Sequence, residues 1–399
     1  MSESWGEGLR SAPADIVFDL EQAAPEVFAA VCERSPGAPA GLERLRGGIP
    51  VMASALPGRQ GPVYRLPGHN RSICIALSDD PAASDVIVLK GSEPLLPDFA
   101  HYLDWMTTRQ FGAWPRPMSE HFPLFEGKAP GTVFLDEAAR EAEIALDVQR
   151  RHLRTYGGLL RLPVPLLVCR LPLDRHTAVV SLLQSKLSAP AFDRVAPHLA
   201  RGIGIFAYHY PGPPVRVHAV GRAASFGPAP RTLASQAHII GTTLPGWFAI
   251  AARLLWLGFL PTSPLAWRLG DIFDANNACL DGGVCDVNSI MPIEAASGDG
   301  FFVRSVVMIT GGLRIATARA FGLPLGEIAQ SYEQELAAFC LGEYVKRGLA
   351  EALETAARPG LTLDPRVRLV FDARTLPELL QLFQTFNGYL GSSDYAPPE

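Results

Sequence analysis

Residues 86–92 read VIVLKGS, an apolar run that ends in a lysine and a glycine turn. Two similar runs precede it, PVYR at residues 62–65 and SICIAL at residues 72–77, and segments containing Gly, Pro and Asn separate the three. Runs of β-branched and other apolar residues bounded by turn-forming residues are typical of β-strands. The pattern therefore predicts three strands of one antiparallel sheet, with Lys90 at the end of the third.

A strong helix is predicted at residues 136–155, because this segment is rich in Ala, Glu, Arg and Leu and ends before two glycines. A lysine at a strand end can reach the phosphates of a nucleotide if a carboxylate on a neighbouring helix holds it. The helix offers three candidates, Glu137, Glu141 and Glu143. We expect Glu143 to pair with Lys90 and count Lys90, Gly91 and Glu143 as cofactor-binding residues, although Lys90 alone would be an ordinary strand-end lysine.

The pattern changes along the chain from strands to helices. Further strands are predicted at residues 165–170 and 178–181, and a helix at residues 20–31 begins after Asp19. From about residue 232 onward helices dominate, at residues 244–257, 303–321, 325–347 and 376–386. We predict an α+β protein with a leader at residues 1–45, a strand-rich lobe at 46–230, and a helical lobe at 231–399 that includes extra C-terminal helices.

The composition gives no support for a broadly charged partner. Of the 399 residues, 48% are hydrophobic and 19% charged, and the formal net charge is −5. Such a balance does not favour binding to a nucleic acid or to an anionic membrane. The most apolar stretch, residues 247–267, is interrupted by Arg253 and by prolines, and the N-terminus lacks the apolar core of a signal peptide. We expect a cytoplasmic protein with no nucleic-acid and no membrane partner.

Residues 194–202 read RVAPHLARG, with two arginines seven residues apart. Arginine side chains bind phosphate oxygens through paired hydrogen bonds, so two of them can hold a triphosphate in one orientation. This segment and its aromatic continuation at residues 205–208 resemble the selenoprotein O family of protein-kinase-like adenylyltransferases. In that family the two arginines bind phosphates of an ATP molecule that lies in a flipped orientation. The resemblance implies that Arg194 and Arg201 bind the phosphates of ATP here.

Residues 271–286 read DIFDANNACLDGGVCD and resemble the catalytic loop and metal-binding aspartate of the same family. The family places a metal-binding Asn nine residues before a metal-binding Asp, and Asn277 and Asp286 have this separation. Mg2+ prefers oxygen ligands, so an amide and a carboxylate on either side of a hairpin can bind it against phosphates. The turn signal DGG at residues 281–283 also predicts an ordinary polar hairpin, and the two interpretations are compatible.

The chain departs from the family at the residue directly before the metal-binding asparagine. The family has an aspartate there as its base, whereas this chain has Asn276, and an amide does not accept a proton at neutral pH. Either Asp274 or Asp271 could take the role of the base. In a second register, Asp271 and Asn276 reproduce the D-x-x-x-x-N spacing of ordinary protein kinases. Asp274, Asp271 and Asn276 are therefore the candidate catalytic residues.

The resemblance covers roughly residues 60–290 and implies a bilobal protein-kinase-like fold that binds ATP and Mg2+. The first interpretation is an adenylyltransferase that transfers AMP to a protein hydroxyl, or to a carboxylate or other small-molecule acceptor. The second is a phosphotransferase of the same fold that acts on a small molecule or a peptide. The third is a pseudoenzyme that binds a nucleotide without turnover. The acceptor stays unknown at this point.

Overall fold

The computed structural model describes residues 9–13, 15–52, 62–64, 66, 72–78, 85–92, 132–186, 189–217, 237–261, 272–273, 277–295, 309, 313, 316–317, 320 and 332–372. The chain divides into two compact units. The first unit contains residues 1–150 and 163–214, and the second contains residues 151–162 and 215–399. The main division after residue 214 is close to the predicted one at residue 230. The short segment 151–162 was not predicted to belong to the second unit.

The first unit is built on one antiparallel sheet with the strand order β2-β8-β9-β6-β5-β4, and β7 also pairs with β9. The strands are β2 (Asp15–Asp19), β4 (Val63–Tyr64), β5 (Ser72–Ala76), β6 (Val86–Lys90), β7 (Val133–Phe134), β8 (Val164–Arg170) and β9 (Ile203–Tyr210). The three predicted strands at residues 62–90 are confirmed as β4, β5 and β6, which pair in chain order. The other edge of β6 pairs with β9, so β6 is a central strand.

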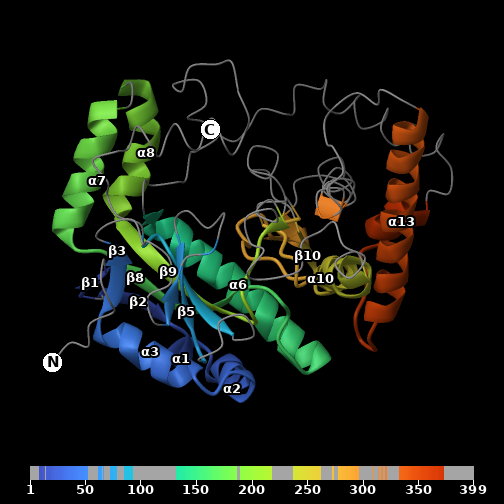
Figure 1. Ribbon diagram of the computed structural model, residues 1–399, viewed down its shortest axis with the longest axis horizontal. Coiled ribbons are helices and arrows are strands. Elements are labelled where there is room, and N and C mark those ends of the chain that lie inside the picture. Colours follow the sequence, from blue (N-terminus) through green and yellow to red (C-terminus); the bar gives the residue numbers. More distant parts are fainter. Residues whose placement is uncertain are drawn as a thin grey trace. The chain divides into compact units, whose positions relative to one another are not determined.

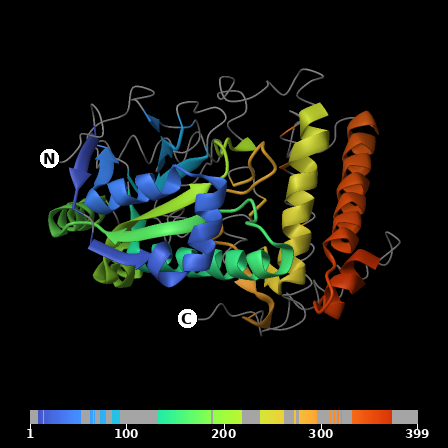
Figure 2. The ribbon, with the colours of Figure 1, turned by 90° about the horizontal axis from the view of Figure 1, so that it is seen from below.

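Among the described residues, five longer helices belong to the first unit in whole or in part. They are α2 (Pro25–Arg34), α3 (Ala38–Gly47), α6 (Leu135–Tyr156), α7 (Leu173–Lys186) and α8 (Ala189–Arg201), and a single-turn helix, α1 (Leu20–Ala23), precedes them. Helices α1, α2 and α3 lie together against the sheet (Figures 1 and 2). The last residues of α6, 151–156, belong to the second unit.

All five residues of β6 are buried, because both faces of the strand are covered. Successive side chains of a strand point to opposite faces. On one face, a Cβ atom added to Gly41 of α3 would lie 2.7 Å from Cδ1 of Ile87, so α3 packs directly on the strand. On the other face, Lys90 contacts Glu141 of α6. The charged end of Lys90 is therefore enclosed between a central strand and a helix.

The predicted leader, residues 1–45, is not separate from the first unit. Strand β2 pairs with β8 in the main sheet, and β1 (Leu9–Ala12) pairs with β3 (Ile49–Met52) in a small ribbon. The predicted helix start after Asp19 is confirmed, since this side chain accepts a hydrogen bond from the backbone N–H of Glu21. The single predicted helix is divided into α1 and α2 because Pro25 begins a new helix.

The predicted strand at residues 178–181 is wrong, because these residues lie within α7. Val179 and Leu183, four residues apart, are its buried positions, which is the spacing of one helix face. A pair of adjacent valines suggested a strand in a window too short to reveal that period. Helices α7 and α8 together form an insertion between the neighbouring strands β8 and β9.

The second unit is mainly helical. It contains the π-helical turn η4 (Ile239–Thr243), α10 (Leu244–Trp256), the 3-10 helix η5 (Ile293–Ala295), α13 (Tyr332–Ala356), α14 (Pro365–Asp372), and β10 (Phe259–Leu260) paired with β11 (Met291–Pro292). The helix predicted at residues 244–257 is confirmed as α10. The helix predicted at 325–347 overlaps α13, which continues to Ala356. The helix predicted at 376–386 lies outside the described residues.

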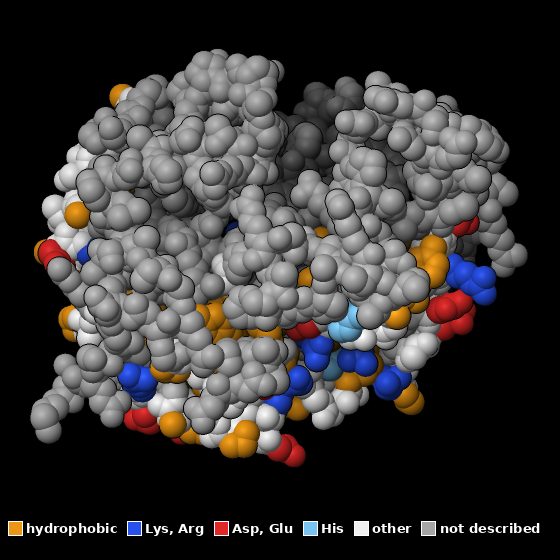
Figure 3. Space-filling model, in the orientation of Figure 1, with side chains coloured by type: hydrophobic (Ala, Val, Ile, Leu, Met, Phe, Trp, Pro, Cys, Tyr) orange, Lys and Arg blue, Asp and Glu red, His pale blue; other side chains and the backbone are white. Residues whose placement is uncertain are grey.

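One apolar segment in the described part of the chain, Ile239–Trp256, meets the length and composition of a membrane span. Its mean hydropathy is 1.3, and 61% of it is buried. A core helix of a soluble protein has the same properties, so the segment is compatible with a soluble protein. On the face shown in Figure 3, basic and acidic side chains of the described residues lie interspersed, in keeping with the small net charge.

Candidate functional site

Lys90 and Glu141 form a buried ion pair at the centre of the first unit. Lys90 Nζ lies 2.7 Å from Glu141 Oε2, and the two side chains are 7% and 3% exposed. Two charges of this size are costly to remove from water unless they are paired, and removing one partner leaves an unpaired buried charge. The geometry therefore fixes the lysine ammonium group at the end of β6 by a helix carboxylate, which is the arrangement expected for a phosphate-binding lysine.

The partner of Lys90 is Glu141, so the prediction of Glu143 is wrong. Glu143 is exposed, while Ala138, Ala142 and Ala145 of the same helix are buried. Residues three or four apart share a helix face, and residues two apart do not. Glu141 stands on the face of the three alanines, and Glu143 stands on the opposite face. The alanine pattern in the sequence was the signal that could have identified Glu141.

Gly91 has a conformational role next to this pair. Its φ angle is +97°, which favours glycine, and an added Cβ atom would lie 2.9 Å from the carbonyl oxygen of Gly204 and 3.0 Å from the backbone nitrogen of Val133. A larger residue would separate β6 from the segments that carry β7 and β9. The predicted contact of Gly91 with a cofactor stays a prediction, while its steric role is directly visible.

Arg194 and Arg201 both lie on α8, seven residues apart. The side chain of Arg194 lies outside the described part of the structure. Arg201 Nη1 lies 2.8 Å from Asp136 Oδ2 in the first turn of α6, and His198 Nδ1 lies 2.9 Å from the same oxygen. The ring of His198 also stacks on Phe134, with the ring centroids 5.2 Å apart.

The first turns of α6 connect the Arg201–Asp136–His198 cluster with the Lys90–Glu141 pair. The backbone N–H of Leu135 donates a hydrogen bond of 3.0 Å to the carbonyl oxygen of Gly202, so the end of α8 is fastened to the start of α6. Asp136 and Glu141 are five residues apart, which is about 7.5 Å along a helix axis. Asp136 was missed by sequence reasoning, because no local pattern links it to Arg201. His198 was also missed, although it lies three residues before Arg201 on the same helix face.

Asn277 and Asp286 lie at the open end of a hairpin in the second unit. Ala278 forms an antiparallel bridge with Val284, and the backbone N–H of Cys285 donates to the carbonyl oxygen of Asn277 at 3.0 Å. The two predicted metal ligands therefore lie next to the paired residues of the two hairpin arms. Their amide and carboxylate oxygens are of the kind that Mg2+ prefers, and Mg2+ sites commonly use one or two protein ligands with phosphates and water.

The hairpin is held in place by α10 and by neighbouring backbone. Trp247 Nε1 donates to the carbonyl oxygens of Cys279 and Gly283 at 3.1 and 3.2 Å, and residues 215–217 pair with the hairpin through Val215, Val217 and the Arg216–Cys279 bridge. At the tip, Gly282 has a φ angle of +81° and lies against Gly246 of α10. These contacts hold the backbone of the hairpin against α10 and residues 215–217.

Cys279 and Cys285 are both free thiols. Complete burial acts to raise the pKa of the Cys285 thiol, but a hydrogen bond with Cys279 and the positive charge of Arg216 outweigh it, so the pKa of Cys285 is lowered. Arg216 Nε donates to the sulfur at 3.2 Å. This interaction adds one more tie between the hairpin and residues 215–217.

The candidate catalytic residues Asp271, Asp274 and Asn276 lie outside the described residues. Their neighbours Ile272 and Phe273 are described and fully buried. No cluster of three or more His, Cys, Asp or Glu side chains suited to a metal ion occurs among the described residues. A site composed of Asn277 and Asp286 is not a cluster of this kind, since it contains one carboxylate and one amide.

A serine, a histidine and an aspartate also lie together in the first unit, but not as a catalytic triad. Ser35 Oγ lies 2.8 Å from His209 Nε2, and Asp85 Oδ2 lies 3.3 Å from that same nitrogen and accepts a hydrogen bond from Ser35. In a triad the aspartate binds the other ring nitrogen. His209 Nδ1 has no hydrogen-bond partner among the described residues. The cluster links the end of α2 to β9 of the sheet.

Comparison with known proteins gives no match: no family model, no curated protein and no solved structure is similar enough to this chain to be matched. The resemblance to the selenoprotein O family therefore stays a prediction based on the short motifs at residues 194–208 and 271–286.

Proposed function

We propose that this protein is an adenylyltransferase with a protein-kinase-like fold, which binds ATP and Mg2+ and transfers AMP to an acceptor oxygen. The observation that carries the proposal is the buried Lys90–Glu141 pair. In protein kinases a lysine on the third N-lobe strand pairs with a glutamate on the following helix and binds phosphates. Here β6 is the third strand of the β4-β5-β6 meander, and α6 follows it.

The arginines favour AMP transfer over phosphate transfer. Arg201 is 66% exposed, and its ion pair with Asp136 lies at the surface. Exposed ion pairs contribute about 0–1 kcal/mol, so Arg201 can exchange Asp136 for a phosphate at small cost. Arg194, on the same helix, is expected to act with it. Two arginines on the terminal phosphates would neutralise the pyrophosphate leaving group and leave the α-phosphate open to attack.

The proposed reaction is a substitution at the α-phosphorus of ATP. An acceptor hydroxyl or carboxylate oxygen forms a bond to this phosphorus, and the bond to the α,β-bridging oxygen breaks. The electron pair of that bond leaves with pyrophosphate, and a hydroxyl acceptor gives its proton to a base, for which Asp274 and Asp271 are the candidates. Mg2+, when held by Asn277 and Asp286, would neutralise charge on the phosphates. Lys90, Arg194 and Arg201 then hold the nucleotide.

A pair of hairpin variants tests the proposal. Asp286 Oδ1 accepts a hydrogen bond of 3.1 Å from the backbone N–H of Asn288, and Asp286→Asn keeps this bond while removing the negative charge. Asp281 at the tip accepts a similar bond of 3.0 Å from Gly283, so Asp281→Asn is a matched control. We expect Mg2+-dependent release of pyrophosphate from ATP by the wild type and by Asp281→Asn, and loss of most of it in Asp286→Asn.

The products distinguish the alternatives. Release of ADP in place of pyrophosphate would support a phosphotransferase, in which Asp271 and Asn276 would act as in ordinary kinases. Saturable ATP binding without either product would support a pseudoenzyme. Equal pyrophosphate release by Asp286→Asn and the wild type would contradict the assignment of the metal ligand.

A further inference from the structure

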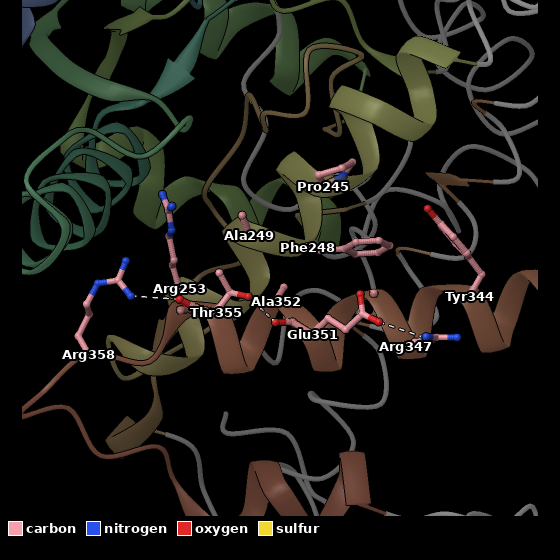
Figure 4. A pocket seen from close by; sticks show the side chains of 12 residues that line it. Pro245, Phe248, Ala249, Arg253, Tyr344, Arg347, Glu351, Ala352, Thr355 and Arg358 are labelled. Atoms are coloured by element: carbon pink, nitrogen blue, oxygen red, sulfur yellow. Dashed lines mark hydrogen bonds and ion pairs between the residues drawn. The ribbon is translucent and has the colours of Figure 1, made fainter.

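A pocket of about 580 Å³ lies between α10 and α13 in the second unit. Its volume falls within the range of about 300–1,000 Å³ that is usual for small-molecule sites. Apolar side chains line its middle, including Phe248 and Ala249 of α10 and Ala352 of α13 (Figure 4). Arg253 and Arg358 lie at one end of the pocket, and Tyr344 lies at the other. The pocket therefore has an apolar body and a basic end.

Arg253 and Arg358 flank the same aromatic ring. Their guanidinium carbons lie 5.1 and 4.9 Å from the centroid of Tyr156, whose hydroxyl donates to the carbonyl oxygen of Ala356 at 2.7 Å. The face of an aromatic ring attracts a cation, but the ring has no net charge and does not neutralise the two guanidinium groups. Burial lowers the pKa of Arg253, and the neighbouring positive charge of Arg358 acts in the same direction, against the influence of Tyr156. Two positive charges are thus gathered at one place.

Neither arginine is paired with a carboxylate among the described residues. Arg253 Nη1 lies 3.1 Å from His152 Nε2, and Arg358 Nη1 donates to the carbonyl oxygens of Thr355 and Ala357 at 3.1 and 2.8 Å. These contacts use one nitrogen of each guanidinium group. The Nε–H and Nη2–H donors of both have no partner in the described part of the chain, and they form the fork that binds an anion through two bonds.

The carboxylate that lines the pocket is already occupied. Glu351 Oε1 accepts a hydrogen bond of 3.0 Å from Arg347 Nε one helical turn away, and both side chains are largely exposed. His152 does not compensate Arg253 either. Burial lowers the pKa of His152 to about 4, helped by Arg253 and opposed by a hydrogen bond with the carbonyl oxygen of Gly158, so the ring is neutral at pH 7. The basic end therefore lacks a counter-charge among the described residues.

We propose that this pocket binds a small amphipathic organic anion, with its apolar body against Phe248, Ala249 and Ala352 and its anionic head on Arg253 and Arg358. The unpaired positive charge would attract the head group, and removal of the apolar body from water adds affinity. The simplest member of this class is a medium-chain carboxylate. The site is independent of the proposed ATP site, because none of its residues is assigned to nucleotide or metal binding.

Titration calorimetry with decanoate, below its micelle concentration, tests the proposal. We expect saturable binding to the wild type, and binding of decanol at least about tenfold weaker. Arg358 is exposed, so Arg358→Gln should fold normally and bind decanoate about ten- to a hundredfold more weakly, because it loses a charged hydrogen-bond donor. Arg253→Lys keeps the charge but loses the fork, and an intermediate loss is expected. Arg368→Gln, an exposed change on α14 at a residue that does not line the pocket, is the control and should change affinity less than about twofold.

Three results would overturn this assignment. Equal binding of decanoate and decanol would leave only an apolar groove. Equal losses in Arg368→Gln and Arg358→Gln would indicate a general attraction of anions to the surface of the second unit. Absence of saturable decanoate binding to the wild type would show that the pocket does not take this class of ligand.

Discussion

Replacement of Lys90 and Glu141, singly and together, separates a structural role from a phosphate-binding role. Each side chain is at least 93% buried, and the two charged atoms are 2.7 Å apart. Removing one partner of such a pair costs about 3–5 kcal/mol, whereas replacing both with apolar residues of similar volume is often neutral or stabilising. Lys90→Met and Glu141→Leu should therefore each reduce stability, and the double variant should recover it.

The expected shift in melting temperature follows from the number of residues in the unit. For a domain of about 200 residues, as in the first unit, 1 kcal/mol shifts the melting temperature by roughly 2–4 °C. Each single variant should then melt roughly 6–20 °C below the wild type, and the double variant should melt within a few degrees of it. Thermal unfolding by circular dichroism measures these shifts, and calorimetry with ATP measures nucleotide binding in the same samples.

ATP binding should be weakened in all three variants, because each lacks the positioned ammonium group. Glu143→Gln, an exposed change on the same helix, is the matched control and should leave both stability and ATP binding unchanged. A double variant that is as stable as the wild type and binds ATP equally well would refute the phosphate-binding role of Lys90. Single variants that melt like the wild type would refute the buried ion pair itself.

Three further changes are expected to have measurable effects. His152 has a pKa of about 4 in the folded state and near 6.5 in the unfolded state, so the unfolded state binds more protons between these two pH values. This histidine should therefore make the wild type about 2–3 kcal/mol more stable at pH 7.5 than at pH 4.5. Urea unfolding should show a smaller difference in His152→Gln. Gly282→Ala should lower the free energy of unfolding by about 2–4 kcal/mol, because φ is +81° and the new Cβ would lie 2.9 Å from a carbonyl oxygen. Gly360→Ala has a similar φ of +85° but open space around it, and it should lower the free energy of unfolding by about 1–2 kcal/mol. Gly348→Ala should destabilise the protein by about 1–2 kcal/mol, because its Cβ would lie 2.4 Å from the ring of Phe248.

Matched variants set the reference for these measurements. His238→Gln changes an exposed histidine and is the matched control for His152→Gln. Equal slopes in His152→Gln and His238→Gln would contradict a buried neutral His152. Gly342→Ala, with open space around it in α13, should stabilise by about 0.5–1 kcal/mol, and the same gain in Gly348→Ala would contradict the close approach of α13 to Phe248. Equal losses of stability in Gly282→Ala and Gly360→Ala would refute the close contact at the hairpin tip.

Local sequence patterns predicted those elements whose secondary structure depends mainly on their own residues. The strands at residues 62–90 were identified because apolar runs and turn residues alternate there, and α6 and α10 because their composition is strongly helical. The pairing of β6 with β9 joins segments separated by α6, β8, α7 and α8, and no local pattern encodes it. The error at residues 178–181 arose because two valines fit a strand and a helix equally well at that length.

The candidate site was predictable in the same uneven way. Lys90 was identified from the end of its strand, and its partner was misassigned because the alanines that mark the buried face of α6 were not considered. The ion pair of Arg201 with Asp136 joins residues 65 positions apart and could not be foreseen. The paired positions of Asn277 and Asp286 across a hairpin follow from the glycine turn between them, which the sequence contains.

Transfer of label from ATP tests the proposed AMP transfer most directly. The protein would be incubated with Mg2+ and with ATP labelled at either the α- or the γ-phosphate, with a soluble cell extract as the source of acceptors. The proposal predicts that acceptors are labelled from the α position, that γ-label leaves as pyrophosphate, and that Arg201→Gln loses about one to two powers of ten in this labelling through loss of a charged contact. Acceptors labelled from the γ position, with Arg201→Gln as active as the wild type, would contradict the proposal and identify a phosphotransferase.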